Sequence, residues 1–174
     1  MTYLDMLVES VDRAQERFER LFEGVTVEEA NRFPAAEVSG QIKSMTWLAW
    51  HTAREMDLQI SDLADTEPIW FSQGWKEKFH LDLPDDTPDW RHSLEEAQKV
   101  QVDDLSLVLG YLDAAVKLTK DYLKSLDEDS LDDIVDDSWT PAVTRGARLV
   151  SIIDDAAMHS GQVIYARRLL GLTD

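Results

Sequence analysis

The sequence of 174 residues contains no cysteine. Disulfide bonds and thiolate zinc sites are therefore excluded, and any metal site must be built from histidine, carboxylate and water ligands. A chain of this length is expected to fold as one domain, residues 1–174, and to bury enough apolar surface to be stable without a structural metal. We therefore expect any bound ion to serve function rather than stability.

Basic residues are scarce, with 17 Lys and Arg against 35 Asp and Glu, so the formal net charge is −18. Nucleic acid and anionic membrane surfaces carry the same sign, which disfavours both as partners. The first residues, MTYLDMLVES, lack the basic and apolar regions of a signal peptide, and no apolar run approaches the roughly 20 residues that span a bilayer. We expect a cytoplasmic protein that binds neither nucleic acid nor membrane.

Four long segments carry apolar residues at steps of three and four, which is the period of an amphipathic helix. They cover residues 3–23, 42–63, 102–126 and 143–170. Thr26 and Glu29 form the pattern of a capping box for a short helix, and Ser44 is suited to cap the second long helix. No segment has a convincing strand pattern. The sequence therefore predicts an all-α fold, a four-helix bundle.

A long segment between the second and third predicted helices, from about residue 65 to 90, has no regular period. It is interrupted by proline and glycine and contains the aromatic residues Trp70, Phe71, Trp75 and Phe79. A loop of this length is uncommon in a small domain unless it covers or binds something. We expect either a lid over one end of the bundle or aromatic side chains that plug the core from outside.

Asp155 and His159 lie four positions apart in the last predicted helix, so they project from one face, one turn apart. A carboxylate and an imidazole placed in this way can hold a divalent ion if a third ligand comes from elsewhere. The same pair is also common on ordinary helix surfaces, where it binds nothing. His51, flanked by Trp47 and Trp50 in the second helix, is either that third ligand or a core histidine.

The other two histidines, His80 and His92, stand in or just after the irregular segment. Neither shares a helical face with a carboxylate in the manner of Asp155 and His159. We expect both to be surface or loop residues rather than metal ligands.

Three stretches of the chain resemble one known family. The second helix contains W-x-x-W-H-x-x-R at residues 47–54, the aromatic loop contains Gly74-Trp75, and the last helix contains D-D-x-x-x-H-x-G-Q at residues 154–162. They resemble the DinB-like superfamily, which includes the amino-terminal domain of mycothiol-dependent maleylpyruvate isomerase and the bacillithiol transferases. The resemblance covers essentially the whole chain. It implies a four-helix bundle that holds a divalent metal with one side chain of the second helix and an i, i+4 pair of the last.

Carried across by this resemblance, the metal ligands are His51, Asp155 and His159. Mycothiol-linked members have a carboxylate at the first position of the pair, as here, and Asp154 or Glu55 could take its place. Two neutral imidazoles and one carboxylate leave a divalent ion with open positions, which is typical of a catalytic rather than a structural site. Zinc or nickel is the expected metal. At such an ion a bound thiol ionises near neutral pH.

Two further residues are candidates for catalysis. Gln162, one turn after His159, could orient a ligand, and Arg54, three residues after His51, could pair with Asp155 or Asp154 or meet an anionic substrate.

The resemblance implies a transferase or isomerase-like protein that uses a low-molecular-weight thiol, of the mycothiol or bacillithiol type, on a small-molecule substrate. The missing cysteine is no obstacle, since the nucleophilic sulfur belongs to the small thiol. A hydrolase that activates water at the same ion and a non-enzymatic dimeric protein for stress-linked binding remain alternatives. A homodimer is the expected assembly, because bundles of this family often pair side by side.

Overall fold

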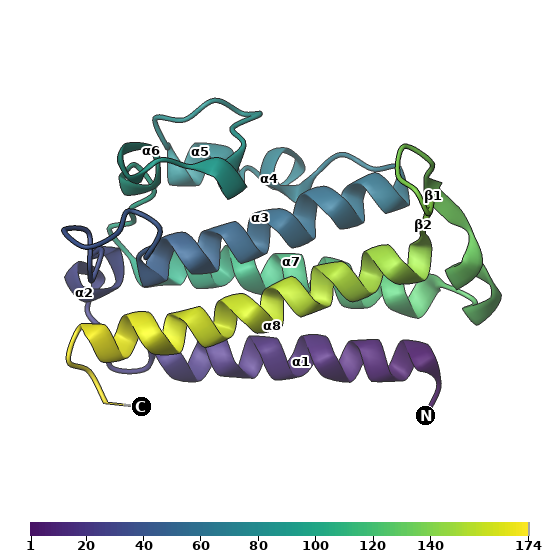
Figure 1. Ribbon diagram of the computed structural model, residues 1–174, viewed down its shortest axis with the longest axis horizontal. Helices are drawn as coiled ribbons and strands as arrows, with labels where there is room; N and C mark the ends of the chain where they lie inside the picture. Colours follow the sequence, from purple (N-terminus) through teal and green to yellow (C-terminus); the bar gives the residue numbers. More distant parts are fainter. Residues whose placement is uncertain (174) are drawn as a thin grey trace.

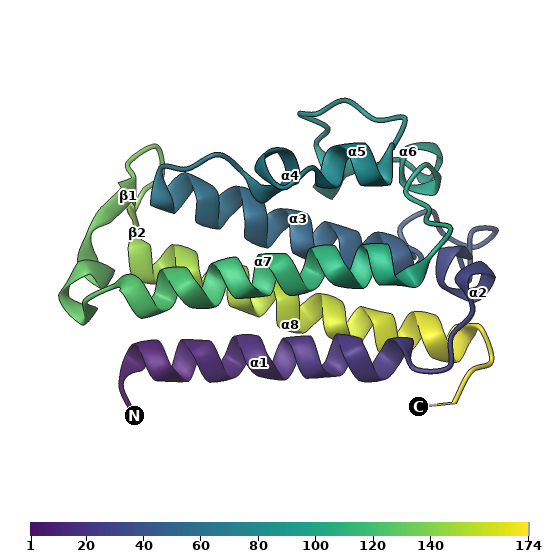
Figure 2. The same cartoon turned by 180° about the vertical axis from the view of Figure 1, so that it is seen from behind.

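The computed structural model describes residues 1–173, which are mostly helical, and places four long helices side by side (Figures 1 and 2). These helices are α1 (Tyr3–Phe22), α3 (Met45–Ala64), α7 (Leu105–Ser125) and α8 (Arg145–Leu169). Each begins and ends within three residues of a segment predicted from the apolar period. The predicted all-α character is confirmed. Among the described residues, no helix combines the length and the apolar character needed to cross a bilayer.

Side-chain caps fix the start of the two helices that carry the predicted ligands. Ser44 Oγ accepts a hydrogen bond from the Trp47 amide at 3.1 Å. Ser44 is therefore the cap of α3, as predicted, and the helix begins three residues later than the predicted segment, which started at residue 42. Thr144 Oγ1 accepts one from the Ala147 amide at 3.2 Å and begins α8. The caps therefore define where α3 and α8 begin, and the apolar face of each helix decides which of its residues pack against the bundle.

Helix α3 lies at the centre of the fold. It packs against α7 and α8, which in turn pack against α1. Of its 20 residues 14 are buried, because neighbouring helices cover one side and the segment that follows α3 covers the other. Polar side chains of α3 therefore lie in largely dry surroundings and need specific partners.

The segment between α3 and α7 folds into short helical pieces that lie along α3 (Figure 1). These are α4 (Ile69–Ser72), α5 (Trp75–Phe79), the 3-10 turn η1 (Asp89–Arg91) and α6 (Leu94–Gln98). Trp70 and Phe79 are buried and contact the ring of Tyr111 in α7. Of the two arrangements expected for this segment, the structure shows the second, in which aromatic side chains plug the core from outside.

Asp57 of α3 holds this segment against the bundle by hydrogen bonds. Its carboxylate accepts hydrogen bonds from the amides of Ile69 and Trp70, each at 2.8 Å, and from the Tyr111 hydroxyl at 2.9 Å. The carboxylate is fully buried, and its charge is compensated by these donors.

Smaller elements lie at the two ends. The Thr26 capping box opens α2 (Val27–Asn31), as predicted. After η2 (Glu128–Asp132), β1 (Ile134–Asp136) pairs antiparallel with β2 (Val143–Thr144). The sequence predicted no strand, and the first two residues of its fourth helix belong to β2. Strands of three and two residues are too short to show an alternating pattern.

Candidate metal centre

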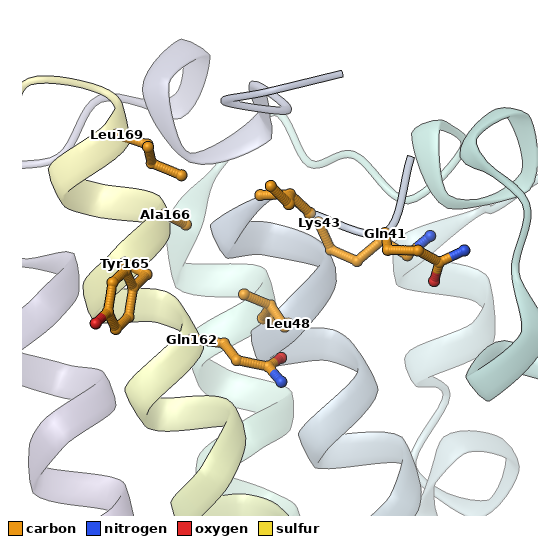
Figure 3. Close-up of a pocket in the computed structure, with 8 residues that line it drawn as sticks. Gln41, Lys43, Leu48, Gln162, Tyr165, Ala166 and Leu169 are labelled. Atoms are coloured by element: carbon orange, nitrogen blue, oxygen red, sulfur yellow. The ribbon is translucent and has the colours of Figure 1, made fainter. Parts of the chain in front are cut away.

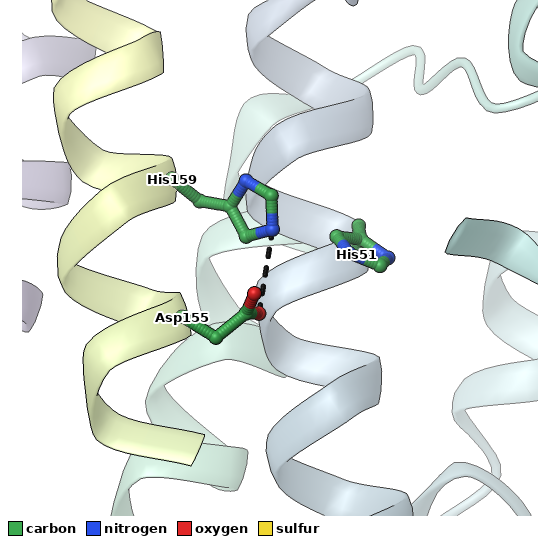
Figure 4. Close-up of side chains that lie close together, drawn as sticks. All are labelled: His51, Asp155 and His159. Atoms are coloured by element: carbon green, nitrogen blue, oxygen red, sulfur yellow. Dashed lines mark ion pairs between the residues drawn. The ribbon is translucent and has the colours of Figure 1, made fainter. Parts of the chain in front are cut away.

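Three side chains from α3 and α8 come together between these helices. Figure 4 shows Asp155 and His159 one turn apart on α8, directed toward His51 on α3. One nitrogen of each histidine and one oxygen of Asp155 lie within 4.8 Å of one another. The two imidazole rings meet edge to face, with their centroids 4.7 Å apart. The structure thus brings together the three residues that the sequence singled out as ligands.

Asp89 orients the ring of His51. Its Oδ2 lies 2.9 Å from Nδ1 of His51, and both side chains are buried. Because a carboxylate can only accept, Nδ1 carries the proton and the lone pair of the neutral ring lies on Nε2. Trp47 stacks on the same ring, with centroids 4.6 Å apart. His51 is therefore held with Nε2 as the nitrogen available to a metal, an arrangement typical of metal-binding histidines.

Gln162 orients the ring of His159 in the way that Asp89 orients the ring of His51. Its Oε1 accepts a hydrogen bond from Nδ1 of His159 at 2.9 Å, which leaves the lone pair of the neutral ring on Nε2. That nitrogen lies 3.3 Å from Oδ2 of Asp155. Two lone pairs at this distance repel unless a cation lies between them. The distance is close to the roughly 3.4 Å that separates two ligands of a tetrahedral ion, each about 2.1 Å from it.

Without a metal, the surroundings of this pair favour protonation of His159. Burial lowers the pKa of His159, but the hydrogen bond and charge of Asp155, the hydrogen bond to Gln162 and the charge of Glu55 outweigh it and raise the pKa above the usual value. The surroundings therefore stabilise positive charge beside Nε2. A divalent cation there would satisfy Nε2 of His159 and the Asp155 carboxylate together, with His51 as the third donor. These residues fit the metal that the sequence implied.

Two other carboxylates were alternatives to Asp155. Asp154 is exposed and lies outside both ligand groups found among the described residues. Glu55, one turn after His51, forms a second group with His51 and Asp89 whose ligand atoms also lie within 4.8 Å of one another. Burial and the charges of Asp89 and Asp155 raise the pKa of the Glu55 carboxyl. Asp155 is the carboxylate that lies close to both histidines.

Arg54 lies three residues after His51 on α3 and contacts the segment that follows this helix. Its Nη2 donates to the carbonyl oxygen of Asp85 at 2.6 Å, and its Nε lies 3.7 Å from Oδ2 of Asp89. Its guanidinium lies over the rings of Trp50 and Trp70. Among the described residues its ion-pair partner is Asp89, not Asp155 or Asp154 as the sequence suggested. Arg54 therefore supports the residue that orients His51.

The remaining histidines differ in their surroundings. His80 is exposed, whereas His92 lies in a loop, as expected, but is buried. Nδ1 of His92 accepts a hydrogen bond from Trp47 Nε1 at 3.1 Å, and Nε2 donates to Thr87 Oγ1 at 2.7 Å. Burial lowers the pKa of His92 below its usual value. The neutral ring thus holds Trp47, which in turn stacks on His51.

No sequence pattern marks Asp89 as a site residue. It follows Pro88 in a stretch without period or motif. The one available signal was chemical: a ligand histidine needs an acceptor for its second nitrogen, and the acidic segment after α3 can supply it.

A cavity of about 280 Å³ opens over the three candidate ligands. Its walls come from α3, α8, the residues before α3 and the exposed Trp90. The lining residues are Gln41, Lys43, Trp47, His51, Trp90, Asp155, Met158, His159 and Gln162. Small molecules can therefore reach the ligand atoms from outside.

Comparisons with known proteins show what this chain is similar to. The crystal structure of a conserved protein from Enterococcus faecalis is similar over 98% of both chains, with 55% sequence identity and a TM-score of 0.92. No curated protein matches the chain. The mycothiol-S-transferase family model matches residues 6–171, which include all three candidate ligands. The chain therefore belongs to the mycothiol-S-transferase family, a branch of the DinB-like superfamily.

Proposed function

We propose that the domain of residues 1–174, a DinB-like four-helix bundle, is a divalent-metal-dependent S-transferase. It joins a low-molecular-weight thiol, of the mycothiol or bacillithiol type, to a small electrophilic substrate. The observation that carries this proposal is the convergence of three electron-pair donors from His51, Asp155 and His159 at one accessible cavity. Family membership supports the thiol, and the two imidazoles and one carboxylate suit zinc or nickel.

A divalent ion held by these donors would lower the pKa of a coordinated thiol, so that the thiolate is present near neutral pH. In the transfer, the sulfur electron pair forms a bond to an electrophilic carbon. The bond from that carbon to its leaving group breaks, the leaving group departs with the bonding pair, and the thiol proton passes to water.

The side chains around the ligands keep this site in one geometry. Asp89 and Gln162 hold the two imidazoles in the tautomer that presents Nε2. The indole ring of Trp47 covers one face of His51 and excludes water from it. We propose that Gln162, at the cavity wall, orients both His159 and the bound thiol, and that Arg54 acts as a positioning residue through Asp89.

Hydrolysis is the second candidate function, and Glu55 is the observation that favours it. This carboxylate lies beside His51 and has a raised pKa, as suits a group that accepts a proton from an attacking water. A hydrolase would release product without any added thiol, which separates the two candidates.

Thiol consumption tests the proposal. Protein without a histidine tag is loaded with zinc or nickel and incubated with mycothiol or bacillithiol and a panel of electrophiles. We expect loss of thiol and a thioether product detected by mass spectrometry, both absent in the metal-free protein and in His159→Ala. Unchanged thiol throughout, with no thiol binding by calorimetry, contradicts the proposal. Product without thiol supports the hydrolase instead.

We also propose a homodimer, on the strength of the family resemblance. Light scattering coupled to size exclusion measures the mass directly. We expect twice the mass of one chain, and the mass of a single chain at micromolar concentration contradicts the dimer.

A further inference from the structure

A groove of about 340 Å³ adjoins the metal cavity and runs between α3 and the last turns of α8 (Figure 3). The two hollows share Gln41, Lys43 and Gln162, so a molecule at the candidate ligands can extend into the groove. Figure 3 shows Gln162 where the groove begins, with its amide directed toward α3.

The walls of the groove are largely apolar. Leu48 of α3 lies on one side and Tyr165, Ala166 and Leu169 of α8 lie on the other (Figure 3). Ile42 also lines the groove. Tyr165 and Leu169 are large side chains left 69% and 52% exposed. Covering such side chains with apolar atoms releases water and is favourable. The walls therefore select an apolar rather than a polar occupant.

The charge of the groove also favours an apolar occupant. Among the described residues that line it, Lys43 is the one charged side chain. Its Nζ donates to the carbonyl oxygens of Gly40 and His92 at 2.8 and 2.9 Å, and the residue is only 8% exposed. The ammonium is thus held by the backbone rather than offered to a ligand. The overall charge of −18 repels anions, and the positive charge of Lys43 in the groove disfavours cations, so the occupant that fits is uncharged.

We propose that this groove binds the apolar body of the electrophilic substrate and that the enzyme acts on uncharged electrophiles with an extended alkyl or aryl group. The proposal rests on the proposed function for its chemistry but not for its binding. With the apolar body in the groove, the reactive carbon lies at the metal cavity. For a primary alkyl bromide, the carbon–sulfur bond forms as the carbon–bromine bond breaks, bromide leaves with the bonding pair and the thiol proton passes to water.

Binding of unreactive probes tests the groove without metal or thiol. Primary alcohols from butanol to decanol are titrated into the full chain and followed by NMR chemical shifts. We expect affinity to rise roughly twofold for each added methylene, about half the effect of full burial, because the groove is open on one side. Affinity that does not depend on chain length overturns the proposal. Tighter binding of decanoate than of decanol also overturns it, because Lys43 would then recognise an anion.

Three variants at exposed positions of α8 locate the binding. Tyr165→Asp and Leu169→Asp are expected to weaken decanol binding at least fivefold, whereas Val150→Asp, on the same helix but outside the groove and 56% exposed, leaves it unchanged. Circular dichroism verifies that all three remain folded. Equal binding by all three variants overturns the proposal.

Kinetics separate this proposal from the proposed function. With a series of alkyl bromides, kcat/KM is expected to rise with chain length and to fall in Leu169→Asp but not in Val150→Asp. Alcohol binding without thiol transfer supports the groove and contradicts the transferase. Transfer that is equally fast for short and long bromides supports the transferase and contradicts the groove.

Discussion

Oδ2 of Asp89 lies 2.9 Å from Nδ1 of His51, although the two residues are 38 positions apart in the chain. The histidine belongs to α3, and the carboxylate belongs to the irregular segment that packs over it. The orientation of a candidate metal ligand therefore depends on the fold of a segment that contributes no ligand itself. Arg54, which lies 3.7 Å from the same oxygen, links this contact to Asp85.

Removing the Asp89 carboxylate is expected to weaken metal binding. In Asp89→Leu, Nδ1 of His51 loses its acceptor and the ring is free to turn, so affinity for zinc falls about 10- to 100-fold. Competition with a chromogenic chelator measures this. Asp86→Leu, at a nearby exposed position, is the control and binds as the native protein does. Native affinity in a folded Asp89→Leu protein contradicts the orienting role.

Gln162 offers a matched pair of substitutions at an exposed position. Gln162→Leu removes the acceptor for Nδ1 of His159, and we expect roughly tenfold weaker metal binding. Gln162→Glu keeps an acceptor and adds negative charge, so affinity is kept or increased. Calorimetry with zinc distinguishes them, and equal loss in both variants means that the amide acts in some other way.

Asp57 is expected to anchor the aromatic segment. Asp57→Ala leaves the Ile69 and Trp70 amides and the Tyr111 hydroxyl buried without their acceptor, at about 1 kcal/mol or more each. We expect a loss of about 3 kcal/mol in the free energy of unfolding, measured with urea. Asp62→Ala, an exposed change on the same helix, costs less than about 0.5 kcal/mol. A loss below about 1 kcal/mol in Asp57→Ala contradicts the anchor.

His92 makes stability depend on pH. Its pKa is lower in the folded protein than the value of 6.5 of an unperturbed histidine. Above pH 6.5 both states are neutral. As the pH falls through 6.5, the histidine of the unfolded chain takes up a proton while His92 of the folded protein stays neutral. The free energy of unfolding therefore falls, by at most about 1.4 kcal/mol per pH unit.

Urea unfolding of metal-free protein at pH 7.5 and 5.5 measures this loss. Because other groups also titrate, the native protein is compared with His92→Asn, in which the loss between the two pH values is expected to be smaller. An equal loss in both proteins means that His92 does not contribute.

The long helices and the Asp155 and His159 pair of the site could be predicted because they depend on the spacing of residues that are close in the sequence. Apolar residues at helical spacing place α3 and α8, and the i, i+4 relation puts Asp155 and His159 on one face. The approach of His51 to that pair followed from the phase of α3 and from the family resemblance.

The other parts of the site depend on contacts between distant segments. Asp89, the burial of His92 and the partner of Arg54 all follow from how an aperiodic segment packs on α3, which no spacing in that segment reveals. The groove beside the metal cavity likewise requires α3 and α8 to be placed together in space.

Metal content of protein purified without a histidine tag tests the central claim most directly. Single variants His51→Ala, Asp155→Ala and His159→Ala are compared with the native chain and with Asp154→Ala, after zinc or nickel loading and dialysis. We predict a single ion per chain in the native protein and in Asp154→Ala, and less than a tenth of that in each of the other three. No ion in the native protein, or an ion retained by all three ligand variants, contradicts the account.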